Sequence, residues 1–110
     1  MEFSTKDHTV VISELPNEVS DLSEQLLKHK EQWYDYNVIL VAQDCTLTAT
    51  SITQAIESVV ESRQSEAKSF VLVDSVERLG QYAEELTAAP TLEEAFDLIE
   101  MEEIERDLGF

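Results

Sequence analysis

The chain has 110 residues, of which 24 are acidic and 7 basic, so its formal net charge is −17. A surface this acidic repels nucleic-acid phosphates and anionic lipid headgroups. This excludes nucleic acid and membranes as expected partners and permits a basic protein partner. Hydrophobic residues make up 43% of the chain and fall in organised runs, which predicts one folded domain and argues against disorder.

Cysteine usage and the first residues indicate the compartment. Cys45 is the only cysteine, so no disulfide can form within the chain and a reducing compartment is expected. The opening sequence MEFSTKDH lacks the basic and apolar regions of a secretory signal, and the longest apolar run is far shorter than a membrane span. We therefore expect a cytoplasmic protein.

In chain order, the first element expected is a hairpin. The β-branched run HTVVISEL at residues 8–15 predicts a strand, and residues 2–5 can pair with it through a turn at residues 6–7. Beyond Pro16, apolar residues recur at helical spacing and predict one amphipathic helix of about four turns that ends near Trp33. The apolar stripe of this helix comprises Val19, Leu22, Leu26, Leu27 and Trp33.

Two buried strands are expected in the middle of the chain, with a helix between them. The runs NVILVA at residues 37–42 and SFVLVD at residues 69–74 are continuous, apolar and β-branched, which predicts strands covered on both faces. Between them, apolar residues at helical spacing from Ile52 to Val60 predict a helix.

The last third predicts two helices and a brief strand. Residues 76–86 predict a short helix weakened by Gly80, and residues 87–90 can add a brief edge strand. A final acidic helix is expected over residues 91–108, because Thr91-Leu-Glu-Glu forms a capping box at its start. The predicted order ββαβαβα(β)α indicates a single α/β domain over residues 1–110, with a mostly parallel sheet of four or five strands and about four helices.

Two stretches carry a resemblance to a known family. The segment ELTAAPTLEEAFDLIE is similar to the end of STAS domains, the fold of bacterial anti-sigma factor antagonists, which closes with a short strand, a Pro-Thr step and an acidic helix start. The segment NVILVAQDCTLTATSITQAI resembles the strand, loop and helix that carry the regulatory serine of those domains. The resemblance implies a STAS-like fold and a regulatory role through contact with a protein such as an anti-sigma factor or its kinase.

The ending PTLEEAFDLIEMEEIERDLGF also resembles that of small acidic bacterial proteins often labelled ribonuclease Z. The hydrolase of that name needs a His-x-His-x-Asp-His cluster, because two zinc ions require several imidazole and carboxylate ligands together. This chain has only His8 and His29, in separate elements and without ligand spacing. Since no nucleophile, base and oxyanion donors converge either, we expect no metal, no cofactor and no enzymatic activity.

The stretch DCTLTATS, residues 44–51, is the first candidate site. Matching its apolar flanks to the STAS family places Thr48 at the family's Asp, Thr50 at its usual phosphoacceptor serine and Ser51 at its glycine. The acid and the glycine are absent, so a degenerate switch is expected. Three interpretations stay open. Thr50 or Ser51 can cap the following helix, and Ser51 with Gln54 fits a capping box. Alternatively, one of these hydroxyls is a phosphoacceptor, or the stretch is an unphosphorylated binding loop.

The final helix is the second candidate site. Its last turns gather acids around one base, Arg106, and end in apolar residues. A solvated acidic face is one interpretation, and a docking helix for a basic partner, such as an RNA-processing enzyme, is the other. The docking candidates are Glu102, Glu103, Glu105, Asp107 and Phe110. Two functions are therefore expected: a non-catalytic regulatory module, or alternatively an accessory protein that docks through this helix.

Overall fold

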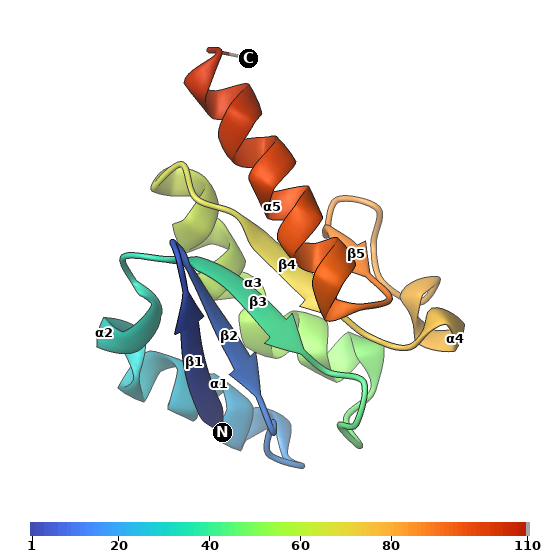
Figure 1. Ribbon diagram of the computed structural model, residues 1–110. Helices are drawn as coiled ribbons and strands as arrows, with labels where there is room; N and C mark the ends of the chain where they lie inside the picture. Colours follow the sequence, from blue (N-terminus) through green and yellow to red (C-terminus); the bar gives the residue numbers. More distant parts are fainter. Residues whose placement is uncertain (110) are drawn as a thin grey trace.

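In the computed structural model, which describes residues 1–109, five strands and five helices follow one another along the chain (Figure 1). Phe110, one of the docking candidates, lies outside the described residues. The strands are β1 (Glu2–Lys6), β2 (Thr9–Ser13), β3 (Asn37–Val41), β4 (Phe70–Val73) and β5 (Ala88–Ala89). The helices are α1 (Val19–Lys28), α2 (Lys30–Trp33), α3 (Ala49–Ser65), α4 (Val76–Leu79) and α5 (Leu92–Asp107).

The strands form one mostly parallel sheet in the order β1-β2-β3-β4-β5. β1 and β2 pair antiparallel as a hairpin whose turn includes Asp7 at φ 55°, and each later strand pairs parallel with the one before it. β5 is the brief edge strand, with Leu72 opposite Ala88 and Val73 opposite Ala89. The predicted α/β domain with a mostly parallel sheet of four or five strands is therefore confirmed.

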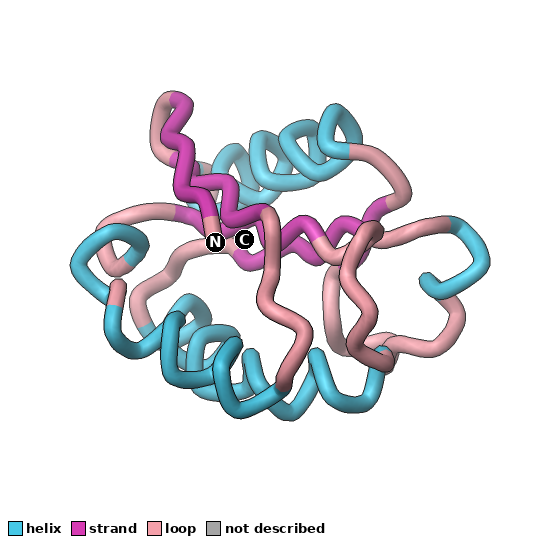
Figure 2. Tube along the Cα trace, turned by 90° about the horizontal axis from the view of Figure 1, so that it is seen from below, coloured by secondary structure: helices cyan, strands magenta, loops and turns pink. Residues whose placement is uncertain are grey.

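The sequential strand order explains how the helices are distributed over the two faces. Each parallel strand is added to the sheet next to the strand that precedes it in the chain. Right-handed crossovers that advance in one direction lie on one face of the sheet, so α1 and α3 pack together against that face. The helix that follows the last strand, α5, packs against β3, β4 and β5 on the other side. Figure 2 shows the sheet edge-on between these helix layers.

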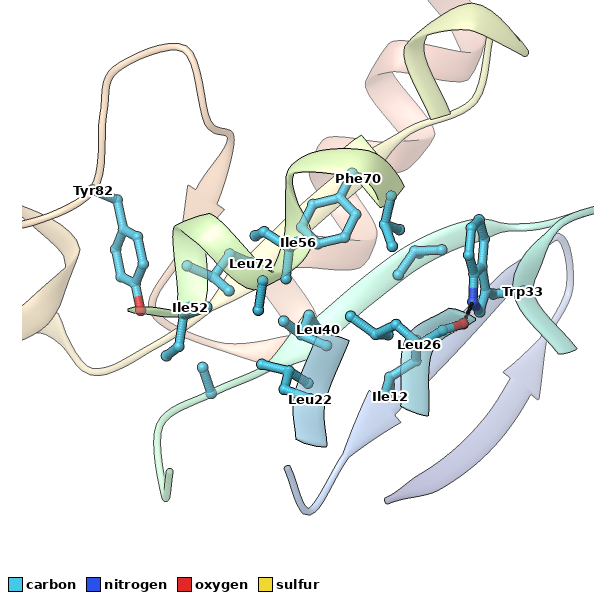
Figure 3. Packing of buried hydrophobic residues seen from close by; sticks show 14 of the residues in the cluster. Ile12, Leu22, Leu26, Trp33, Leu40, Ile52, Ile56, Phe70, Leu72 and Tyr82 are labelled. Carbon is cyan, nitrogen blue, oxygen red and sulfur yellow. Dashed lines mark hydrogen bonds between the residues drawn. The ribbon is translucent and has the colours of Figure 1, made fainter. Parts of the chain in front are cut away.

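The larger core lies between the sheet and helices α1 and α3 (Figure 3). Alternate residues of a strand point to opposite faces, so Val38 and Leu40 of β3 enter this core while Ile39 enters the smaller core under α5. β3 is thus covered on both faces, as its continuous apolar run predicts. The large side chains of the larger core include Ile12, Leu22, Leu26, Trp33, Ile52, Ile56, Phe70 and Leu72.

The expected helix over residues 19–33 is divided into α1 and α2 at His29, which gives five helices where about four were predicted. His29 has φ −103° and ψ 26°, outside the helical range. The Leu26 carbonyl, which the amide of residue 30 would take in an unbroken helix, accepts instead from the indole N–H of Trp33 at 2.8 Å (Figure 3). Trp33 is buried, as predicted, and its indole supplies the donor that the interrupted helix lacks at the Leu26 carbonyl.

The helix expected over residues 76–86 is also shorter than predicted. α4 ends at Leu79, with Gly80 as its C-terminal cap. Glycine is a poor helix former, and the chain beyond it turns Tyr82 into the protein interior. The prediction correctly identified Gly80 as a weak point but not as the end of the helix.

A buried arginine joins α3 to the connection between α2 and β3. Arg63 is fully buried, and its Nη1 atom donates to the carbonyls of Tyr34 at 2.7 Å and Tyr36 at 2.8 Å. Its guanidinium also stacks over the Trp33 ring at 4.9 Å from the centroid, a favourable cation–π geometry. Arg63 therefore fixes the segment that leads into the central strand.

Replacing Arg63 with methionine should lower the free energy of unfolding by about 3 kcal/mol, because the two carbonyls lose charge-assisted hydrogen bonds while the apolar stem is kept. Urea denaturation followed by circular dichroism measures this loss. The neighbouring exposed Gln64→Met variant is the control and should change stability by no more than about 0.5 kcal/mol. Equal stability of the two variants would contradict a clamping role for Arg63.

Candidate functional site

The first candidate site lies at the carboxyl edge of the parallel strands. β3 ends at Val41, and the loop of residues 42–48 leads from this edge to the first residue of α3. In open α/β sheets this edge carries ligand and partner sites, because loops from neighbouring strands meet there. The position is therefore suited to recognition.

Thr48 is the residue that caps α3. It has an extended backbone, with φ −72° and ψ 160°, and its hydroxyl accepts the backbone N–H of Ser51 at 3.1 Å. The expectation that Thr50 or Ser51 forms the cap, with Gln54 completing a box, is wrong. The helix begins earlier because Ala49 is buried and already belongs to its first turn.

The cap engages two of the three predicted hydroxyls, those of Thr48 and Ser51. Ser51 is half-buried, and its Oγ accepts a hydrogen bond from the Thr48 hydroxyl at 3.1 Å. Thr50, in the first turn of α3, is exposed, and within the described part of the chain no hydrogen bond holds its hydroxyl. The structure thus brings the three predicted residues together at the start of α3, where Thr48 and Thr50 are exposed.

An arginine from α4 holds the loop in front of α3. Arg78 donates from Nη1 to the carbonyl of Cys45 at 3.1 Å and from Nη2 to the carbonyl of Leu47. The half-buried thiol of Cys45 contacts the carbonyl of Pro16 at 3.7 Å, and Thr46 donates to the Asn17 side chain at 3.0 Å. These contacts tie the loop both to α4 and to the segment before α1.

A buried carboxylate keeps Arg78 in place. Asp74, directly after β4, has no exposed surface, and its Oδ2 atom lies 3.3 Å from Nε of Arg78. Oδ2 also accepts the hydroxyl of Tyr82 at 2.6 Å, while Oδ1 accepts the N–H of Ser75 at 2.7 Å. Burial, reinforced by the hydrogen bond to Asp74, raises the pKa of Tyr82 well above its usual value.

These groups form a buried hydrogen-bond network behind the loop. Asp74 has no exposed surface, so a molecule bound at the protein surface does not reach its carboxylate. The strands of the sheet also follow one another without a reversal of order, so the described sheet lacks the switch-point crevice in which α/β enzymes bind cofactors. The arrangement is suited to presenting a rigid surface.

The residues presented at this edge form what we call the carboxyl-edge surface: Glu14, Asp44, Thr46, Thr50 and Val76. Val76, the first residue of α4, has 71% of its side chain exposed, the largest fraction among the exposed large apolar residues in residues 1–109. A hollow of about 430 Å³ lies beside Glu14 and Asp44. The surface thus combines hydroxyl, acidic and apolar groups, as protein contact surfaces do.

The second set of candidates divides between the inside and the outside of α5. Glu102 accepts from the Ser69 hydroxyl at 2.5 Å, and Glu103 accepts from the Asn37 side chain at 3.2 Å. Both acids are half-buried and connect α5 to the amino ends of β3 and β4. Glu105 and Asp107 are exposed. The predicted cluster is therefore not one continuous face.

Asp74, Arg78 and Tyr82 were not identified from the sequence. A signal was present, because an aspartate that directly follows a buried apolar strand, with an arginine four residues later, is a common arrangement for a local ion pair. The contacts of Arg78 with the loop before α3 join residues more than thirty positions apart and depend on the fold.

Within residues 1–109, neither a membrane-spanning helix nor a cluster of metal ligands is found. None of the helices within residues 1–109 is both long and apolar enough to cross a bilayer. In the same part of the chain, no group of three or more His, Cys, Asp or Glu side chains is placed to hold a metal ion.

Replacing Arg78 with alanine should loosen the loop in front of α3, because two loop carbonyls lose their donor and Asp74 loses its balancing charge. Alkylation of Cys45, the only cysteine, reports this directly and should become at least about tenfold faster, since faster local opening exposes the thiol. The exposed Glu77→Ala variant is the matched control. Alkylation at the wild-type rate in the Arg78 variant would show that the loop does not need this anchor.

Tyr82→Phe should lower the free energy of unfolding at pH 7 by about 2 kcal/mol, because buried Asp74 loses a donor. Since the pKa of Tyr82 is raised on folding, the unfolded chain releases its phenolic proton first. Wild-type stability should therefore fall as the pH rises above about 10.

The alkaline fall should be smaller in Tyr82→Phe. It should not vanish, because a hydrogen bond to Glu66 raises the pKa of Tyr34 in the same direction. Urea denaturation at pH 7 and pH 10.5, with Tyr36→Phe as the control, measures both effects. An unchanged alkaline fall in Tyr82→Phe would contradict the role given to the buried network.

Comparison with known proteins adds no further assignment. No family model matches the chain, and no curated protein matches it.

Proposed function

We propose that the chain is a non-catalytic regulatory module that acts by protein–protein contact through the carboxyl-edge surface, in the manner of an anti-sigma factor antagonist whose phosphoswitch is degenerate. Its partner is a cytoplasmic protein, such as an anti-sigma factor or a related kinase, and not nucleic acid or a membrane. The observation that carries the proposal is the anchoring of the loop before α3 by Arg78, which leaves Thr50 exposed.

The anchored loop supports a binding role because rigid surfaces lose less conformational entropy when a partner binds. Arg78, which is paired with buried Asp74, donates hydrogen bonds to two backbone carbonyls of the loop and so holds its shape. Asp74 has no exposed surface, and no nucleophile stands beside a base in the described site. A protein contact surface accounts for this arrangement better than an active site.

The STAS resemblance supports the same surface. Thr48, at the position of the family's Asp, provides the helix cap, and Thr50, at the usual phosphoacceptor position, lies exposed in the first turn of α3. A phosphate on Thr50 would be favoured by the free N–H groups at the helix start. It would also add charge to an acidic contact surface and weaken its complex with a partner.

A second candidate function is an accessory role, in which α5 docks on a basic protein such as an RNA-processing enzyme. The observation that favours it is the outer side of the last turns of α5, where Met101, Ile104 and Leu108 are exposed beside acidic residues. This surface differs from the carboxyl-edge surface, so the two functions can be tested separately.

The first function predicts that Thr50→Glu weakens partner capture by at least about tenfold, since the added charge opposes a contact made at the start of α3. Tagged wild-type chain and variant are incubated with native lysate, and the retained proteins are quantified by mass spectrometry. Phosphopeptide mapping of the recovered chain shows in addition whether Thr50 or Ser51 is modified.

Gln64→Glu is the matched control, because it adds the same charge at an exposed position near the other end of α3. It should retain every protein that the wild type retains. If Thr50→Glu and Gln64→Glu retain the same proteins in the same amounts, the carboxyl-edge surface is not the site of capture.

A further inference from the structure

Helix α5 is longer than the sheet that it covers. Its 16 residues span about 24 Å, whereas the 4 residues of β4 span about 13 Å. Figure 1 shows the C-terminal turns of α5 extending past the edge of the sheet. The last turns of α5 therefore reach beyond the first residues of β3 and β4.

The inner side of α5 changes in character along its length. In its first half, Ala95 and Ile99 are buried against the sheet. Further on, the contacts become polar: Glu102 and Arg106 both bond to Ser69, and Glu103 bonds to Asn37. The projecting turns are thus held in place by hydrogen bonds, which leaves their apolar residues free to face outward.

The outer side of the projecting turns carries an apolar stripe. Met101, Ile104 and Leu108 follow at spacings of three and four residues, which places them on one face of the helix. Their side chains are 58%, 52% and 65% exposed. Three of the eight exposed large apolar residues in residues 1–109 lie on α5, and a fourth, Leu108, is its C-terminal cap, so α5 carries more of them than any other described helix.

Acids border the stripe. Asp97 and Glu105 are exposed and lie one helical turn on either side of Met101, and exposed Glu100 lies one turn before Ile104. The one base of α5, Arg106, is engaged with Ser69 and Glu102. The outer face of α5 is therefore apolar along its centre and negatively charged along its borders.

The charge distribution selects among the possible occupants. A second copy of the chain would bring another net charge of −17 and another acidic helix, so the two faces would repel each other. A basic amphipathic helix complements both the apolar stripe and the acidic borders of α5. Its apolar side covers the stripe, and its lysines or arginines pair with the bordering acids.

We propose that the outer face of α5, formed by Met101, Ile104 and Leu108 with Asp97, Glu100 and Glu105, docks a basic amphipathic helix of a partner protein. This inference rests on the second candidate function, for which it specifies the contact residues and the chemistry of the partner. Glu102 and Glu103 serve to hold α5 on the sheet and are not part of the docking face.

The probe is a helical peptide of leucine and lysine with the leucines on one face, and its binding to the full chain is measured by fluorescence anisotropy. A peptide of the same composition with the leucines dispersed has the same charge without the apolar face. We expect the amphipathic peptide to bind at least about tenfold more tightly than the dispersed one, because the stripe supplies the difference.

The decisive variant is Met101→Glu combined with Ile104→Glu, with circular dichroism to verify folding. It should weaken binding of the amphipathic peptide at least about tenfold. Simple electrostatic attraction predicts the opposite, since the variant is more acidic and would attract the peptide more strongly. Leu27→Glu, which alters a side chain 60% exposed on α1, is the control and should bind as the wild type does.

Three results would overturn the proposal: equal binding of the two peptides, undiminished binding by the double variant, or equal losses for the double variant and Leu27→Glu. A wild-type dimer in sedimentation equilibrium that the double variant abolishes would also overturn it and assign the face to a second copy.

The experiments distinguish a failure of the docking proposal for α5 from a failure of either proposed function. Thr50→Glu should leave peptide binding unchanged, because it lies at the carboxyl edge while the projecting turns contact the amino edge through Asn37 and Ser69. If the peptide results hold but no lysate protein depends on Met101 and Ile104, the docking chemistry stands and the accessory function fails.

Discussion

The fully buried carboxylate of Asp74 is the constraint on which the candidate site depends. An unpaired charge at this depth would be strongly destabilising, so Arg78 must remain beside it. Because the remaining nitrogens of Arg78 hold the carbonyls of Cys45 and Leu47, the same ion pair also sets the shape of the loop before α3. Stability of the core and geometry of the surface are thus coupled at one arginine.

The two candidate surfaces lie at opposite edges of the sheet and are supported differently. The carboxyl edge is held by charge-assisted bonds from Arg78, and the projecting turns of α5 are held by bonds to Asn37 and Ser69 at the amino edge. Both surfaces are acidic, in keeping with the net charge of −17. A basic protein partner suits either edge, so contact geometry, and not overall charge, must distinguish the two functions.

Much of the fold followed from periodicity, because continuous apolar runs gave β3 and β4 and the alternation of elements gave the parallel sheet. The end of α1 and the start of α3 could not be predicted from periodicity. The break at His29 depends on the Trp33 indole reaching a carbonyl seven residues earlier, and Thr48 and Ser51 are equally good capping residues until the burial of Ala49 decides between them. The candidate hydroxyls could be predicted from the sequence. The network of Asp74 and Arg78 that holds the loop before α3 could not, because it joins distant elements.

The central claim is that the chain binds its partner through the rigid surface at the start of α3. Hydrogen–deuterium exchange of the free chain and of the complex with its captured partner tests this directly. The account predicts that residues 44–51 and the first turn of α4 become protected in the complex, with little change at the exposed face of α1. Unchanged exchange in residues 44–51, with protection confined to other elements, would contradict it.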